Sequence, residues 1–295
     1  MTFSFFKKRP DTFDYEAERT CKNCGNTFRG RFCNHCGEKV IDAADRSFGR
    51  LAESILNAFT FLEGKFWRSF KTMVLNPGKL SAQIRDGVQV PYMRLIGLFF
   101  VANFFYFLFP VFDTFNSPLA SQFYFQSYSD VVQSLVRDHI KSNSLDVKAY
   151  TDAYNAHTAN LSKLLIVVLV FLYTLPLAII NFSKKNLYFD HLQLSFEFHA
   201  FTLLLCSVLI PLALKGLIQL ASAGFGLDWS MLLTDDVYST FSRLLFAYFF
   251  IRAQYVYYGN RWWVAIIKGG VLAYLVFYFW YIYRFILFLA TFYTL

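Results

Sequence analysis

Charged residues are scarce in this chain, and the familiar catalytic motifs are missing from it. Only 16% of its 295 residues are charged, whereas about 25% are charged in an average soluble domain, which argues against an ordinary soluble protein. The sequence contains no glycine-rich phosphate loop, no HExxH motif and no GxSxG nucleophile elbow, so it indicates none of the chemistries that depend on them. It also shows no internal repeat of the kind that inverted-repeat transporters have. We therefore favour a non-catalytic role over an enzymatic one.

The first ten residues, MTFSFFKKRP, do not resemble a signal peptide. The charges follow the apolar residues, and the apolar stretch is too short. We therefore expect the first membrane span to direct its own insertion.

Apolar residues make up 56% of the chain and gather in long runs. A helix needs about 20 such residues to cross the hydrocarbon core of a bilayer. The runs predict an all-α polytopic membrane protein with about five transmembrane helices, over residues 95–112, 164–182, 200–220, 237–258 and 262–284. Residues 285–295 either continue the last helix with a strong tilt or lie along the outer interface.

The distribution of Lys and Arg predicts the orientation of these spans. Residues 1–91 contain 15 of the 28 basic residues, and Lys184, Lys185 and Arg261 lie in the second-to-third and fourth-to-fifth connections. The loop 113–160 carries five Asp against three basic residues. Because basic residues concentrate on the cytoplasmic side, we expect a bacterial inner-membrane protein with its N-terminus in the cytoplasm and its C-terminus outside.

A short cysteine motif precedes the apolar part of the chain. Its sequence is CKNCGNTFRGRFCNHCG, so Cys21, Cys24, Cys33 and Cys36 form two CxxC pairs, each followed by glycine. Gly accepts the positive φ that a chain needs to turn tightly around one ion. Four thiolates favour a single structural Zn²⁺, and a redox dithiol and an iron centre are the alternatives. The motif predicts a cytoplasmic zinc ribbon over residues 1–40.

The surroundings of this motif are basic and aromatic. Lys22, Arg29, Arg31 and Lys39 can offset the negative charge of a four-thiolate site, and Phe28 and Phe32 are candidates for a small apolar core. His35 reads as a solvated neighbour of the metal rather than a ligand. The same basic residues can face anionic lipid of the inner leaflet. Because the charges have these two uses, nucleic-acid binding is not favoured.

Residues 41–91 connect the ribbon to the membrane domain, 92–295. Apolar residues recur at helical spacing in RSFGRLAESILNAFTFLEG, residues 46–64, and basic and aromatic residues alternate in the stretch that follows. This pattern predicts amphipathic juxtamembrane helices, which either lie on anionic lipid of the inner leaflet or pack against the bundle. The NPG sequence at residues 76–78 ends the helical stretch.

Several cations fall inside predicted spans, among them Lys215, Arg252, Lys268 and Arg284. Lys215 and Arg252 lie about 7.5 Å and 9 Å along the helix from the nearest span end. Long cationic side chains snorkel to the interface over such distances, and the alternative is that they line a substrate pathway.

Several stretches in this order resemble a bacterial family of multi-span membrane proteins that is classified as a domain of unknown function. They are the ribbon at residues 21–37, TMVLNPGKLSAQIRDG, SKLLIVVLVFLYTLPLAI, YFDHLQLSFEFHAF and AQYVYYGNRWWVAIIK. The resemblance implies the ribbon and the membrane domain, and it implies no activity.

One of these stretches departs from the family pattern. The family has three histidines where this chain has His191, Glu197 and His199. A carboxylate can replace His as a metal ligand, but on a straight helix His191 and His199 lie about 80° apart and Glu197 and His199 about 200° apart. We therefore expect a polar cluster at the membrane interface rather than a metal site.

The sequence predicts a non-catalytic role. The expected function is docking of a cytoplasmic protein partner by the ribbon, or organisation of the membrane. The alternatives are a carrier or channel for a small molecule, ion or lipid, and, third, a membrane metal-dependent enzyme.

Overall fold

The computed structural model describes residues 14–21, 23–37, 40, 64–88, 90–109, 114–183 and 187–295. The chain divides into two compact units, Met1–Leu62 and Glu63–Leu295, which we call the ribbon unit and the helical unit. The expected amphipathic helix over residues 46–64 lies almost entirely outside the described residues, as do Lys22 and Lys39.

A two-stranded antiparallel sheet forms the described part of the ribbon unit. Strand β1 (Glu18–Thr20) pairs with β2 (Thr27–Arg29), with Arg19 opposite Phe28. Phe28 is buried with two of the cysteines, but the prediction that Phe32 belongs to the same core is wrong, since Phe32 is 57% exposed. A single aromatic ring and the cysteine sulfurs therefore make up most of this small core.

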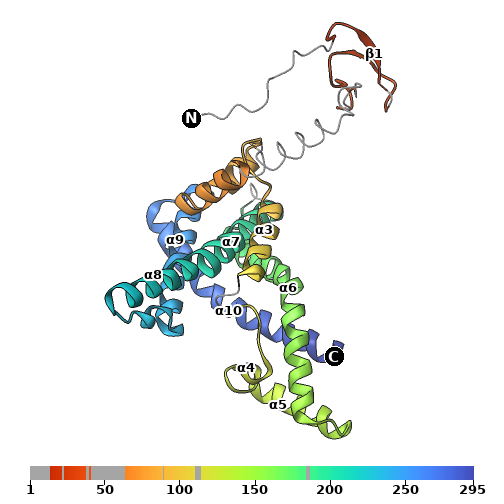
Figure 1. Ribbon diagram of the computed structural model, residues 1–295. Helices are drawn as coiled ribbons and strands as arrows, with labels where there is room; N and C mark the ends of the chain where they lie inside the picture. The colour runs from red at the N-terminus through yellow and green to blue at the C-terminus, as the bar shows by residue number, and fades with distance from the viewer. Residues whose placement is uncertain are drawn as a thin grey trace. The chain divides into compact units, whose positions relative to one another are not determined.

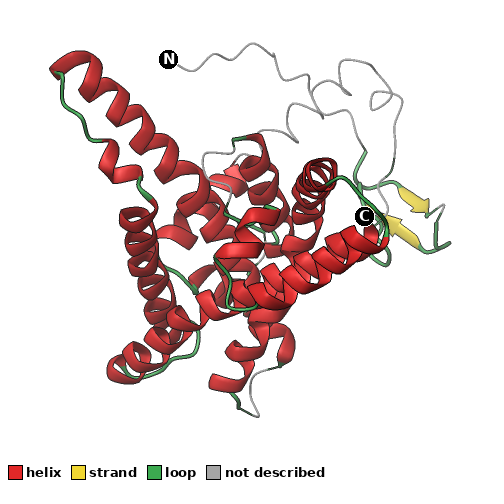
Figure 2. Cartoon of the chain, turned by 90° about the horizontal axis from the view of Figure 1, so that it is seen from below, coloured by secondary structure: helices red, strands yellow, loops and turns green. Residues whose placement is uncertain are grey.

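In the described part of the helical unit, all regular secondary structure is helical, and short turns and loops join the helices (Figures 1 and 2). A helix over residues 64–75 is followed by α2 (Lys79–Arg85), α3 (Leu95–Leu108), α4 (Leu119–Tyr124), α5 (Ser129–Ser142), α6 (Val147–Ile180), α7 (Tyr188–Phe201), the π-helix η2 (Thr202–Leu209), α8 (Ile210–Phe225), the 3₁₀ helix η3 (Ser230–Leu233), α9 (Asp235–Val256) and α10 (Trp262–Thr294).

Three helical stretches among the described residues are long and apolar enough to cross a membrane: Val147–Ile180, Tyr188–Gly224 and Trp262–Thr294. The first span of the prediction corresponds to α3, which is apolar but has only 14 residues and measures about 21 Å. The fourth corresponds to α9, where Arg243 and Arg252 lower the hydropathy. The structure therefore supports a membrane protein, and the count of five spans is not confirmed.

The second span candidate, Tyr188–Gly224, combines α7, η2 and α8 in one continuous helix. Its middle part has the wider turns of a π-helix. Pro211, at the start of α8, follows this part directly. A proline ring clashes with the carbonyl of the preceding helical turn and offers no N–H, which is a physical reason for wider turns at this place.

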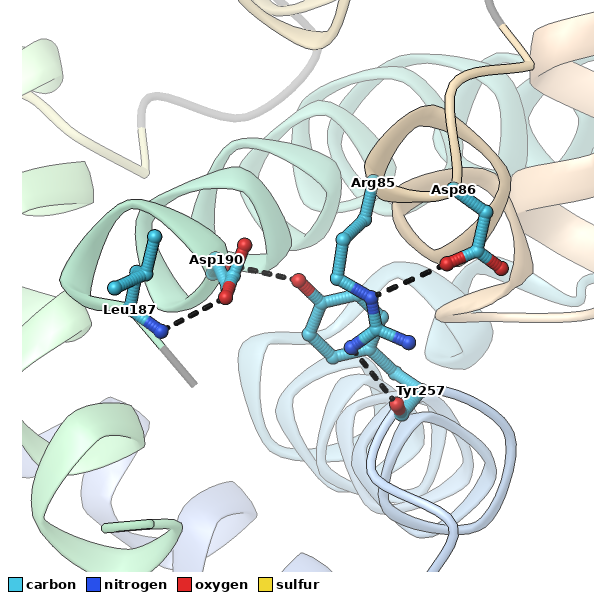
Figure 3. Close-up of polar contacts among 5 residues, drawn as sticks. All are labelled: Arg85, Asp86, Leu187, Asp190 and Tyr257. Atoms are coloured by element: carbon cyan, nitrogen blue, oxygen red, sulfur yellow. Dashed lines mark hydrogen bonds and ion pairs between the residues drawn. The ribbon is translucent and has the colours of Figure 1, made fainter. Parts of the chain in front are cut away.

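Contacts define two ends of the helical unit. At the end that we call the α2 end, α2, α7 and α9 meet: Arg85 Nη1 donates to the Tyr257 carbonyl at 3.3 Å, and the Tyr257 hydroxyl donates to the Asp190 carbonyl at 3.0 Å (Figure 3). The Arg85 guanidinium also lies 4.4 Å from the centre of the Tyr257 ring. The Tyr257 side chain at the end of α9 thereby links α2 to α9 and α9 to α7.

At the opposite end, α4 and α5 pack against the start of α6 and the end of α10, and we call this assembly the cap. Its core contains Tyr154 and Phe288, and Gln122 Nε2 donates to the Arg284 carbonyl at 3.1 Å. Helices α6 and α10 contain 34 and 33 residues, or about 50 Å each, which exceeds a hydrocarbon core of about 30 Å. Residues 285–294 therefore continue α10 into the cap.

Candidate metal centre and buried polar contacts

The four cysteines predicted as metal ligands lie together in the ribbon unit. Their sulfurs are within 4.8 Å of one another, with Cys21 Sγ 3.5 Å from Cys36 Sγ and Cys24 Sγ 3.7 Å from Cys33 Sγ. In a tetrahedral zinc site with Zn–S bonds of about 2.3 Å, neighbouring sulfurs are about 3.8 Å apart. All four thiols are free rather than joined in disulfides. The cluster therefore has the size of a four-thiolate metal site.

Tight turns bring each CxxC pair to the cluster. The N–H of Gly25 donates to the Cys21 carbonyl at 2.9 Å, and the N–H of Gly37 donates to the Cys33 carbonyl at 2.8 Å. Gly25 and Gly37 have φ values of 73° and 77°. A side chain is strained in this left-handed region, so the glycine after each pair is required by the turn.

Backbone dipoles and neighbouring thiols set the protonation of the cluster. The N–H groups of Cys36 and His35 point at the Cys33 sulfur and lower the pKa of this thiol to about 6, against the effect of burial. The N–H of Asn26 lowers the pKa of Cys24, but burial and the three other thiols outweigh it and raise this pKa to about 12. The thiols thus compete for negative charge, and a divalent cation relieves this competition by replacing their protons.

The donor set fits a structural metal. Four sulfurs complete a tetrahedral shell and leave no open position for a substrate or an activated water. Among the residues that the structure describes, no other group of three or more His, Cys, Asp or Glu side chains is close enough to share an ion. The four cysteines could therefore hold a metal ion.

The second predicted group, His191, Glu197 and His199, lies on α7, and all three residues are buried. Their side chains have separate partners. His191 Nδ1 is 2.7 Å from the Tyr258 hydroxyl, and His199 Nδ1 is 2.8 Å from the carbonyl oxygen of Ser195. The three side chains thus take part in three different contacts between or within helices.

Glu197 binds the start of α2. Its carboxyl group accepts the N–H of Gly78 at 2.9 Å, the N–H of Ser81 at 2.8 Å and the hydroxyl of Ser81. The first N–H groups of a helix lack partners within the helix and carry partial positive charge, so a buried carboxyl group satisfies them well. This contact makes Glu197 the anchor of α2 in the helical unit.

The turn before α2 fits closely against α9. Gly78 has φ of 82°, and a Cβ atom at this position would lie 2.8 Å from Cα of Ala253. Arg252 Nη2 donates to Asn76 Oδ1 at 3.1 Å. The NPG sequence therefore forms a turn that Glu197 and Arg252 hold from two different helices. Nothing in the sequence pattern indicates this contact, because its partners are 116 or more residues apart.

Lys215, which was also predicted to lie inside a span, is exposed on α8. Among the described residues, one large cavity opens at the α2 end and another in the cap. Neither is lined by Lys215 or Arg252, nor by the predicted polar residues of α7.

Comparisons with protein-family models, with curated proteins and with solved structures find no match for this chain. The resemblance to an uncharacterised membrane family stays a prediction.

Proposed function

We propose that the chain is an integral membrane protein whose zinc ribbon docks a cytoplasmic protein partner. The observation that carries this proposal is the closed four-thiol cluster, which lies in a unit separate from the apolar helices. A structural metal gives a short segment a fixed surface that its few apolar residues could not maintain. We identify the metal as Zn²⁺ because four thiolates in tetrahedral arrangement are its preferred ligands.

The environment of the cations supports docking over the carrier alternative. In a carrier we expect intramembrane charges to line a cavity near the middle of the bilayer. Here Arg252 binds the NPG turn, Glu197 binds the start of α2, and Lys268 Nζ lies 3.4 Å from Asn181 Oδ1. These polar groups serve contacts between helices.

We further propose five spans, with α3 and α9 added to the three long apolar helices. The start of α6 and the end of α10 contact the cap, and Tyr106 of α3 packs on Phe115 just before α4. At the other end, the end of α9 and the start of α7 meet α2, and the start of α3 lines a cavity with Ile84 of α2. The Lys and Arg distribution then puts the α2 end in the cytoplasm and the cap outside, in the bacterial inner membrane. Docking of a cytoplasmic partner depends on this orientation, because the ribbon must lie on the cytoplasmic side of the membrane.

The docking proposal is tested by comparing the partners that five proteins retain: the wild type, three point variants and one truncated chain. The wild type and Arg252→Leu should both retain a cytoplasmic partner after crosslinking in cells, because residue 252 lies outside the ribbon. The chain without residues 1–40 and the Cys33→Ser variant should lose it, and Cys206→Ala is the matched control for a cysteine outside the cluster.

A purified partner must then bind the zinc-loaded protein and dissociate when zinc is removed. Retention of all partners by the truncated chain would contradict docking. Loss of a scorable cellular function in Arg252→Leu beside a healthy truncation would favour the carrier.

A further inference from the structure

A cavity of about 510 Å³ opens at the α2 end of the helical unit. It lies among α2, the turn before α3, α6 and α7, and most of its walls are apolar side chains such as Ile96, Phe171, Phe189 and Phe196. Its size falls within the roughly 300–1,000 Å³ of ordinary ligand sites. Ile96, Phe171 and Phe189 are also exposed beyond the cavity, so its wall continues into the outer surface of the helices.

The cavity has the depth of one lipid leaflet. Phe171 precedes the last residue of α6, Ile180, by nine residues, which is about 14 Å along the helix. Phe196 follows the first residue of α7, Tyr188, by eight residues, or about 12 Å. Half of a hydrocarbon core is about 15 Å thick. An acyl chain that entered at the α2 end would therefore reach the bottom of the cavity near the middle of the bilayer.

The rim of the cavity is suited to a negative charge. Arg94 lines it, is exposed and precedes the first residue of α3, whose first N–H groups lack partners within the helix.

Two acids on the segments around this cavity, Asp86 after α2 and Asp190 on α7, are already engaged. Asp86 lies 3.6 Å from Arg85, and Asp190 accepts the N–H of Leu187 at 2.8 Å (Figure 3). Arg94 itself forms no ion pair in the part of the chain that the structure describes. A cation at the mouth of an apolar cavity therefore has no ion-pair partner among the described residues.

We propose that this cavity binds an anionic glycerophospholipid from the leaflet on the α2 side. Its phosphate group contacts Arg94 and the first turn of α3, and one acyl chain lies along Ile96, Phe171 and Phe196. This site differs from the general attraction of basic juxtamembrane helices to anionic lipid, because it is a cavity with one cation at its mouth. The inference requires that the helical unit spans a bilayer, and it does not depend on docking by the ribbon.

The test uses the full chain in phosphatidylcholine nanodiscs. Two photoreactive lipids carry the same diazirine acyl chain, one with a phosphatidylglycerol head group and one with phosphatidylcholine, and crosslinked peptides are mapped by mass spectrometry. We expect the anionic probe to label the segments around Phe171 and Phe196 about fivefold more than the neutral probe, as one basic contact with an anionic head group implies.

Two variants separate the head group from the acyl chain. Arg94→Gln should remove the preference for the anionic probe, and Ile96→Trp should reduce labelling by both probes because it fills the cavity mouth. Both residues are exposed, so both variants should fold. The matched controls, Arg68→Gln and Ile267→Trp, alter exposed residues outside the cavity and should label as the wild type does.

Three labelling results would overturn the proposal, and one competition result would do so as well. The labelling results are equal labelling by the two probes, an unchanged preference in Arg94→Gln, and unchanged labelling in Ile96→Trp. Displacement of the anionic probe by excess glycerol phosphate in solution would also overturn it, because the site would then bind a soluble phosphate.

Discussion

Glu197 lies on α7, but its hydrogen-bond donors belong to residues that precede it by 116 and 119 positions. Sequence reasoning singled out this residue because it takes the place of one of three histidines in the family that the chain resembles, and the helical spacing already separated the three side chains. The actual partner could not be read from the sequence, since it depends on how a short helix packs against a distant one. The residue itself was found, and its role was not.

Glu197→Ala should destabilise the helical unit by about 2 kcal/mol or more, because it leaves two buried N–H groups of α2 without acceptors. Glu197→Gln keeps one acceptor oxygen and should cost less. Thermal unfolding of the detergent-solubilised protein measures both, with Gln219→Ala on the exposed surface of α8 as the control. Equal stability of Glu197→Ala and the control would contradict the anchoring role.

Two adjacent glycines of α10 provide a second prediction at this scale. A Cβ atom on Gly269 would lie 2.7 Å from the backbone nitrogen of Ile251 on α9, whereas a Cβ on Gly270 would meet nothing within 4 Å. Gly269→Ala should push α9 and α10 apart and cost about 1–3 kcal/mol. Gly270→Ala should be neutral or stabilising by up to about 1 kcal/mol, since Ala favours a helix.

The same unfolding measurement compares the two alanine variants directly. Equal losses in both would mean that helix propensity, and not the α9–α10 contact, decides the stability at these positions.

At the scale of elements, apolar runs were a better guide to the centres of helices than to their ends. The run at residues 164–182 continues N-terminally as a helix from Val147, whose start is capped by Asp146 accepting the N–H of Ala149 at 2.8 Å. The sequence predicts a separate helix over residues 144–165, opened by a Ser cap. The structure confirms a helix there but joins it to the span, caps it with Asp146 and packs it against α10. The amphipathic helix α5, by contrast, has the apolar periodicity that its sequence shows.

The cap provides the prediction at this scale. Phe288 of α10 is fully buried among α4, α5 and α6, so Phe288→Ala should cost the cap about 3–5 kcal/mol. Tyr293 is 74% exposed, and Tyr293→Ala is the matched control. We expect faster hydrogen exchange and proteolysis at residues 114–146 in Phe288→Ala alone. Unchanged protection of this segment would show that the end of α10 does not hold the cap.

At the scale of the whole molecule, the proposed topology of five spans can be tested with fusions. A reporter that is active only outside the cytoplasm should be active when fused after Leu295 and silent when fused after Ser183. A reporter that fluoresces only in the cytoplasm should give the reverse pattern. An active Ser183 fusion would contradict the five spans or their orientation.

The ribbon was the part of the molecule best predicted from sequence. Cysteine spacing and the following glycines determine a local structure almost completely, so Cys21, Cys24, Cys33 and Cys36 lie together as expected. The exposure of Phe32 was not foreseen, because the spacing of cysteines does not say which side of the hairpin an aromatic residue occupies. Long-range contacts of the helical unit lie beyond such local rules.

The central claim is that a zinc-organised head is joined to an independent membrane body. The most direct measurement is the metal content of the full chain, purified without chelator, together with the unfolding temperature of its helical unit. We predict about one zinc per chain in the wild type and in Cys206→Ala, and none in Cys33→Ser, with the same unfolding temperature for the helical unit of the wild type and Cys33→Ser. Absence of zinc from the wild type, or unfolding of the membrane body in Cys33→Ser, would contradict the account.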